Sequence, residues 1–155
     1  MVMQKEDLQK LPEFERALVL AGIKHAGQID KGGEPYVMHV IRVMMKLEEE
    51  EARVAALLHD LLEDTDIEES DLLELGFDED IVGIVKLLTR DPKEDYMDYI
   101  RNLAKDKRAI LIKLSDLTDN QNRTRIKGAL SRADLERLEK YHRAEEYLIS
   151  VLDKI

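Results

Sequence analysis

The chain of 155 residues contains no cysteine, which excludes disulfides, thiolate metal sites and cysteine nucleophiles. It also has no apolar run that approaches the ~20 residues of a transmembrane helix. The amino-terminal residues are polar and lack the apolar segment of a signal peptide. From these absences we expect a cytoplasmic protein that has no membrane partner.

Residues that disfavour helices are scarce as well, because the chain has only 7 glycines and 3 prolines, and aromatic residues make up 5% of it. Leucine, alanine, glutamate and lysine are abundant instead, which favours an all-α fold. The length suits about one domain with a real hydrophobic core, and no linker or internal repeat divides it. We therefore expect a single all-α domain over residues 1–155.

Positive charge is in deficit, since 34 acidic residues outnumber 24 basic ones and the formal net charge is −10. A protein that binds duplex nucleic acid needs a basic surface, so we expect no nucleic-acid partner. A small anionic ligand is still compatible with this composition, because a site can be locally positive inside an acidic protein.

Apolar residues recur at helical spacing along most of the chain, and no segment alternates convincingly with the period of a strand. After a short helical lead within residues 1–12, the spacing predicts helices over residues 13–26, 36–47, 52–64, 69–75, 78–88, 96–104, 107–123 and from about 132 to near the end. Two glycines and a proline predict a loop over residues 28–35. A second loop is expected around Lys127-Gly128, with Ser131 as the amino-terminal cap of the last helix.

One polar stretch lies inside an apolar helix pattern: His59-Asp60-Leu61-Leu62-Glu63-Asp64 holds one imidazole and three carboxylates. A helix through these residues places His59 over Glu63 and Asp60 over Asp64. Burying so many polar groups is costly unless they are paired or ligate a metal. The adjacent pair His59-Asp60 can supply two ligands to one ion, which indicates a metal-dependent hydrolase. A solvated acidic helix end is the simpler alternative.

A metal site needs further ligands, and two other segments offer them. His39 lies near the start of the second predicted long helix, and Asp116 interrupts the apolar helix at IKLSDL. Two histidines and two aspartates would suit Mn²⁺, Fe²⁺ or Zn²⁺ better than Ca²⁺, and such a metal lowers the pKa of a bound water. Taken singly, His39 could be a core histidine and Asp116 could pair with Lys113.

The order His39, His59-Asp60, Asp116 resembles the HD-domain phosphohydrolase superfamily. The segments KHAGQIDKGGEPYVMH, AALLHDLLEDT and AKDKRAILIKLSDLTDN are similar to the hydrolase domain of RelA/SpoT-type alarmone enzymes and of stand-alone small alarmone hydrolases. This resemblance implies an HD-domain helical bundle of about seven to nine helices. It also implies removal of the 3′-pyrophosphate from guanosine tetra- or pentaphosphate.

The resemblance assigns roles to eight residues of this chain. It implies that one Mn²⁺, or another divalent transition metal, is bound by His39, His59, Asp60 and Asp116. It implies that Glu63 and Asp64 position or activate the attacking water. Lys31 matches a loop residue that packs near the guanine, and Asn120 matches an asparagine near the nucleoside.

The chain departs from the family pattern where the substrate is read. Asp30 stands where a basic residue is usual before the loop lysine, and Leu117 and Asp119 stand where arginine and histidine are usual. An acid at position 30 would weaken attraction to a highly charged nucleotide. Arg123 and Arg125 lie a little further on and could supply phosphate contacts.

Two alternatives to the alarmone assignment stay open. The departures favour an HD phosphohydrolase that acts on another nucleotide or phosphoester. A nucleotide-binding regulatory module without turnover is the alternative of another class, although Glu63 and Asp64 are both present. The last helix leaves homo-oligomerisation open, through apolar residues at Leu135, Leu138, Tyr141 and Leu148.

Overall fold

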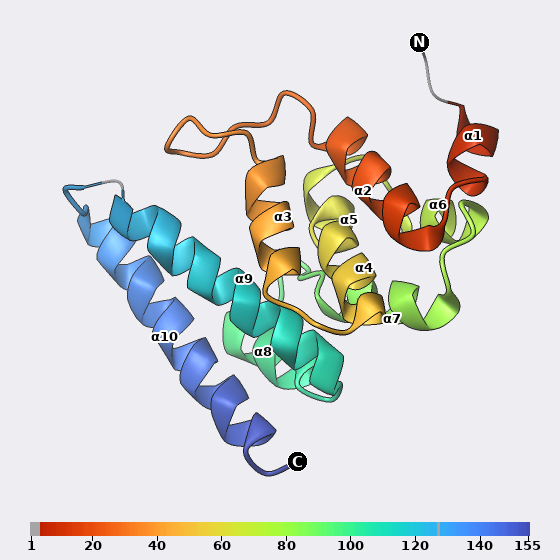
Figure 1. Ribbon diagram of the computed structural model, residues 1–155. Helices are drawn as coiled ribbons and strands as arrows, with labels where there is room; N and C mark the ends of the chain where they lie inside the picture. Colours follow the sequence, from red (N-terminus) through yellow and green to blue (C-terminus); the bar gives the residue numbers. More distant parts are fainter. Residues whose placement is uncertain (1–3, 127) are drawn as a thin grey trace.

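The computed structural model describes residues 4–126 and 128–155, which form helices joined by loops (Figure 1). The helices are α1 (Lys5–Gln9), α2 (Glu13–Lys24), α3 (Val37–Met45), α4 (Glu50–Leu58), α5 (Leu61–Asp64), α6 (Glu69–Glu74), α7 (Glu79–Leu87), α8 (Tyr96–Leu103), α9 (Lys107–Ile126) and α10 (Arg132–Leu152). Strand pairing within the described residues is limited to one isolated bridge between Ile29 and Pro35. The all-α prediction is therefore confirmed.

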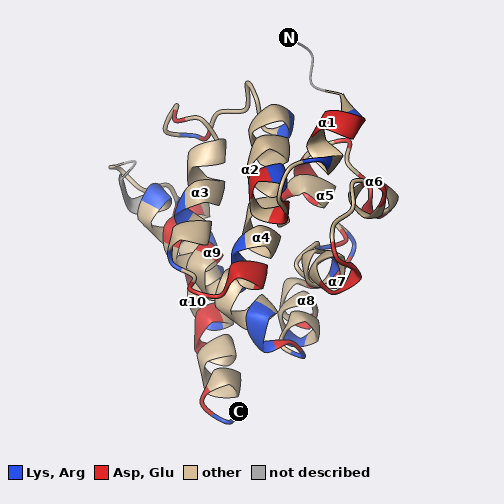
Figure 2. Ribbon diagram, turned by 45° about the vertical axis from the view of Figure 1, so that its right-hand side comes forward, with Lys and Arg blue, Asp and Glu red and all other residues tan. Residues whose placement is uncertain are grey.

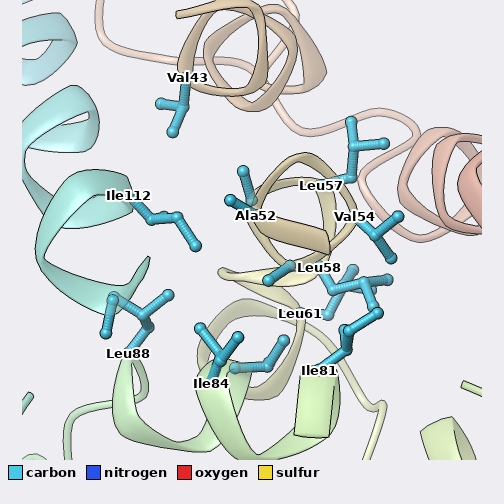
Figure 3. Close-up of a cluster of buried hydrophobic side chains, with 14 of the residues drawn as sticks. Val43, Ala52, Val54, Leu57, Leu58, Leu61, Ile81, Ile84, Leu88 and Ile112 are labelled. Carbon is cyan, nitrogen blue, oxygen red and sulfur yellow. The ribbon is translucent and has the colours of Figure 1, made fainter. Parts of the chain in front are cut away.

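Helix α4 is the centre of the fold, because α2, α3, α7 and α9 all pack against it. Its segment 54–58 is buried on every side, as expected for a helix surrounded by other helices. Figure 3 shows side chains of α4 on different sides of the helix: Leu57 points away from Ile84 and Ile112, which approach α4 from neighbouring helices. This packing fixes the carboxyl end of α4, where His59 follows.

The central segment differs from the sequence prediction of one helix over residues 52–64. The structure begins α4 at Glu50, ends it at Leu58 and starts α5 at Leu61. At the junction the N–H of His59 donates to the carbonyl of Ala56, and Asp60 has φ −99° and ψ −1°. The tightened turn re-aims the chain between the two helices.

Helix α10 lies alongside α9 and also reaches α8 (Figure 1). Its start is capped as predicted: the N–H of Asp134 donates to Ser131 Oγ at 3.1 Å, and the N–H of Ser131 donates to the Asp134 carboxylate at 3.0 Å. Along this helix Leu148 is buried, whereas Leu135 is 56% exposed. Lys127, in the loop between α9 and α10, and the side chain of Arg125 lie outside the described residues.

The loop between α2 and α3 extends beyond the helices, as Figure 1 shows. Asp30 organises it: one carboxylate oxygen accepts the N–H groups of Gly32 at 2.9 Å and Glu34 at 3.0 Å. Gly33 has φ +84°, a left-handed conformation that glycine adopts without a steric penalty. The residue that departs from the family pattern is thus a structural part of the loop.

Acidic side chains lie in α6 and in the first turns of α4 and α7 (Figure 2). They account for part of the net negative charge without lining the cavities described below. No helix in the described part of the chain is long and apolar enough to cross a membrane.

Candidate active site

The four side chains predicted to bind a metal converge beside the carboxyl end of α4. One ligand atom from each of His39, His59, Asp60 and Asp116 lies within 4.8 Å of the others. Asp116 Oδ1 lies 2.9 Å from His39 Nε2 and 3.4 Å from His59 Nε2, and Asp60 Oδ2 lies 3.1 Å from His59 Nε2. Helices α3 and α9 and the α4–α5 junction therefore contribute to one cluster, which we call the metal cluster.

The break between α4 and α5 explains how two consecutive residues reach the same point. Neighbouring side chains of a continuous α-helix diverge, since successive residues are rotated by about 100°. Because α4 ends before His59 and Asp60 precedes α5, both side chains turn toward Asp116. His59 and Asp60, which the sequence placed within one continuous helix, therefore come together because the helix is interrupted between α4 and α5.

Both histidines are oriented by hydrogen bonds on the far side of the ring. His59 Nδ1 lies 2.6 Å from the carbonyl oxygen of Ala56, and His39 Nδ1 lies 2.6 Å from Asp119 Oδ2. A carbonyl or carboxylate oxygen can only accept, so Nδ1 carries the proton in each ring. Nε2 of each ring faces the cluster carboxylates, which outweigh burial and raise the pKa of both imidazoles. A bound metal would replace the proton on Nε2, and the rings would then have the arrangement of metal-ligating histidines.

The carboxylates are held in the ionised form that metal binding requires. Burial opposes ionisation of Asp60, but the two histidines outweigh burial and lower its pKa to about 2. Tyr36 also donates its hydroxyl to Asp60 Oδ2 at 2.6 Å, and Lys113 Nζ lies 2.8 Å from Asp116 Oδ2. Lys113 pairing is thus real, but it occupies only the outer oxygen of Asp116. The nitrogen and oxygen donors fit a divalent transition metal.

Glu63 and Asp64 are the residues predicted to position or activate the attacking water. They line the same cavity of about 320 Å³ as Asp60 and Asp116. Glu63 is positioned by the backbone N–H of Arg90, which donates to its carboxylate. Both side chains are exposed on one side, yet burial of the rest, followed by repulsion from Asp60, raises the pKa of each carboxyl. A raised pKa makes a carboxylate a stronger proton acceptor.

Lys31 and Asn120 are brought together in an adjoining cavity of about 450 Å³. Lys31 is exposed on the α2–α3 loop, and Asn120 lies on α9 with its side-chain nitrogen 3.4 Å from Asp116 Oδ1. The two cavities share Asn120 with Tyr36, Arg123 and Tyr141 in their linings. A ligand can therefore extend from the loop to the metal cluster.

Sequence reasoning did not assign a role to Asp119. It is buried, accepts from His39 Nδ1, and receives Arg42 Nε at 2.7 Å on its other oxygen. Its spacing of three residues from Asp116, on the same face of one helix, was the available signal. Tyr36, three residues before His39, was missed as well. Arg123 lies 3.6 Å from Asp30 and 3.3 Å from Asp119, so its charge is partly neutralised.

Known proteins are similar to this chain in sequence and in fold. A family model described as HD domain matches residues 17–137. The guanosine-3′,5′-bis(diphosphate) 3′-pyrophosphohydrolase of Aquifex aeolicus is 40% identical in an alignment of 139 residues that covers 77% of this chain and 20% of that protein. The Drosophila melanogaster enzyme of the same name, MESH1, is 39% identical in an alignment of 121 residues that covers 70% of this chain and 67% of the relative.

The coverage of these relatives differs. The chain spans about a fifth of the length of the first curated relatives and two thirds of the Drosophila protein. A solved structure of a metazoan orthologue of SpoT, described as hydrolysing ppGpp, superposes with a TM-score of 0.75 at 29% identity and covers 93% of this chain and 96% of its own. Because the HD model spans most of the sequence and a relative matches over two thirds of its length, the chain belongs to the HD-domain family.

Proposed function

We propose that the chain is a Mn²⁺-dependent phosphohydrolase that removes the 3′-pyrophosphate of guanosine 3′,5′-bis(diphosphate). The observation that carries this proposal is the metal cluster, in which both imidazoles present Nε2 and two carboxylates complete the donor set. The names of the relatives from Aquifex and Drosophila support the substrate. The assignment of His39, His59, Asp60 and Asp116 as ligands is part of the proposal.

A metal held by this cluster would polarise a phosphate oxygen and lower the pKa of a water. The chain's own contribution is a carboxylate pair next to the cluster. Glu63 accepts the proton of the attacking water, because the Arg90 N–H fixes it beside Asp60 and its pKa is raised. Asp64 orients the same water, since it lines the same cavity one residue further on.

The reaction balances without a further co-reactant. The water oxygen forms a bond to the phosphorus nearest the ribose, and the bond between that phosphorus and O3′ breaks. The water proton passes to Glu63, and the leaving O3′ takes a proton from solvent, to which Glu63 then returns its own. The products are guanosine diphosphate and pyrophosphate.

The nucleoside is placed in the 450 Å³ cavity, which suits the size of a small ligand. Asn120 lies at the boundary of the two cavities, where the ribose would lie if the phosphate reaches the metal. Lys31 lines the end of this cavity formed by the α2–α3 loop, where the base would lie. This placement gives Lys31 and Asn120 roles in binding rather than in bond breaking.

Release of pyrophosphate from guanosine 3′,5′-bis(diphosphate), with and without added Mn²⁺, tests the proposal. The metal-loaded protein should turn over, and the chelated protein should not. Metal and nucleotide binding without turnover would overturn the proposal in favour of a regulatory module.

A second candidate substrate is favoured by one observation. Asp30 pairs with Arg123 in the lining of the nucleoside cavity, so that cavity offers less positive charge than the arginine alone would provide. A nucleotide with fewer phosphates, or another phosphoester, would tolerate this better. A panel of nucleotides at equal concentration separates the two candidates by their kcat/KM values.

A further inference from the structure

Besides Arg123, which pairs with Asp30 and Asp119, three cations from different elements line the 320 Å³ cavity beside the metal cluster. Arg90 follows α7, Lys113 lies on α9 and Lys140 lies on α10, and all three line the cavity. The Arg90 guanidinium lies 5.5 Å from the ring centre of Tyr96, and Lys140 Nζ lies 4.5 Å from it. Lys113 Nζ lies 5.4 Å from the ring of Tyr99, which neighbours Tyr96 at 6.0 Å.

Arg90 and Lys140, the two cations farther from the metal cluster, have no carboxylate partner among the described residues. The Arg90 guanidinium donates to the backbone carbonyl of Glu94 at 3.2 and 2.8 Å. Neither Arg90 nor Lys140 has a side-chain carboxylate oxygen within 4.0 Å of its cationic nitrogens in the part of the chain that the structure describes. Partial burial, followed by repulsion from Arg90, Arg137 and Lys113, lowers the pKa of Lys140. An anion bound among them would relieve this repulsion.

A tyrosine hydroxyl in the same group lacks a partner as well. Tyr96 lines the cavity, and its hydroxyl oxygen is buried without a hydrogen bond to any described residue. Burial raises the pKa of Tyr96 to about 12, so the hydroxyl remains a donor at neutral pH. A buried polar atom that makes no hydrogen bond is uncommon in folded proteins and calls for a ligand or a water.

We propose that Arg90, Lys140 and Tyr96 form the subsite for the outer phosphate of the substrate's 3′-pyrophosphate, with Lys113 at its inner edge. Phosphate oxygens accept several charge-assisted hydrogen bonds at once, which matches two cations and a hydroxyl. This inference rests on the proposed function for its substrate, but the subsite would bind inorganic pyrophosphate whichever nucleotide is hydrolysed.

The arrangement of the two cavities sets the direction in which the substrate extends. The nucleoside cavity joins the metal cavity at Asn120 and Tyr36. With the inner phosphorus at the metal cluster, the outer phosphate points away from the nucleoside. Arg90, Lys140 and Tyr96 line the metal cavity and are absent from the lining of the nucleoside cavity.

The test compares Lys140→Gln and Tyr96→Phe with the unmodified protein, with Mn²⁺ in excess over pyrophosphate. We expect Lys140→Gln to raise the inhibition constant of inorganic pyrophosphate roughly tenfold and Tyr96→Phe to raise it several-fold. KM for guanosine 3′,5′-bis(diphosphate) should rise in parallel. Turnover of guanosine 5′-diphosphate 3′-monophosphate, which has no outer phosphate, should be unchanged in both variants.

Lys86→Gln is the matched control, because Lys86 is an exposed lysine on α7 that pairs with Glu69 away from the cavity. Inhibition constants that change by less than about twofold in both variants would overturn the subsite. Calorimetric titration of the Mn²⁺-loaded protein with pyrophosphate separates the two proposals. Binding that depends on Lys140 in a protein inactive on the guanosine substrate would refute the proposed function and support the subsite.

Discussion

The metal cluster and the α2–α3 loop differ in how the fold holds them. In the cluster, His39 and His59 are 1% and 3% exposed and are attached to helices that pack with α4. The loop carries the exposed Lys31 and is held by hydrogen bonds to Asp30 and by ion pairs of Asp30 with Arg123 and of Glu34 with Arg42. The geometry of the cluster therefore depends on the core, whereas the loop can change its side chains without disturbing that core.

This difference indicates which half of the site, the metal cluster or the loop, tolerates substitution. A change in the cluster leaves a buried polar group without its partner, which costs free energy as well as activity. A change on the loop alters contacts that water can replace. The departure from the family pattern at Asp30, on the loop, is thus compatible with an intact metal cluster.

Among substitutions in the two regions, Asp60→Ala should have the largest effect on turnover. We expect this variant to lose turnover entirely, because it removes a predicted ligand and leaves Tyr36 and His59 without their partner. Metal binding, measured by calorimetry, should fall with it. Asp66→Ala is the control, since Asp66 is exposed and pairs with Lys24. Retained metal affinity in Asp60→Ala would contradict the ligand assignment.

Glu63→Gln should separate chemistry from metal binding. Loss of the proton acceptor is expected to lower kcat by roughly 10²–10⁴ while the metal affinity is retained. The neutral amide still accepts the N–H of Arg90, so the local structure should persist. If kcat changes less than threefold, Glu63 is not the base, and Asp64→Asn becomes the variant to measure.

Asp119→Asn tests the support of the cluster. The substitution removes the carboxylate charge that faces His39 Nδ1. Metal affinity should then fall by about 10–100-fold, the usual effect of losing such a partner. The substitution also leaves Arg42 with a weaker acceptor. Asp98→Asn on α8, an exposed residue, is the matched control. Unchanged metal affinity in Asp119→Asn would show that Arg42 and the helix packing suffice to orient His39.

The loop should give the smallest effects. Lys31→Gln is expected to raise KM several-fold with kcat unchanged, because the contact is exposed. Asp30→Asn keeps an oxygen for the Gly32 and Glu34 N–H groups but releases Arg123, so KM for the guanosine substrate should fall a few-fold. A fall in kcat with either substitution would show that the loop takes part in the chemistry.

Much of the fold could be predicted from local pattern. The helical spacing and the scarcity of glycine and proline indicated an all-α chain, and most helices begin or end within two residues of their predicted bounds. The α4–α5 break could not be predicted, since residues 52–64 read as one apolar helix. The break brings His59 to Asp116 on the distant helix α9, and a local pattern carries no information about such a contact.

The sequence by itself predicted the candidate donor set and the paired carboxylates, because residue identity and spacing indicate both. It indicated the chemistry at His59-Asp60 before any contact was known. Only the tertiary structure decided that Asp119 supports His39, that Arg90 fixes Glu63, and that the cations of three elements share a cavity with Tyr96. These relations join residues far apart in the chain, and they exist only because packing around α4 brings α3, α7 and α9 together.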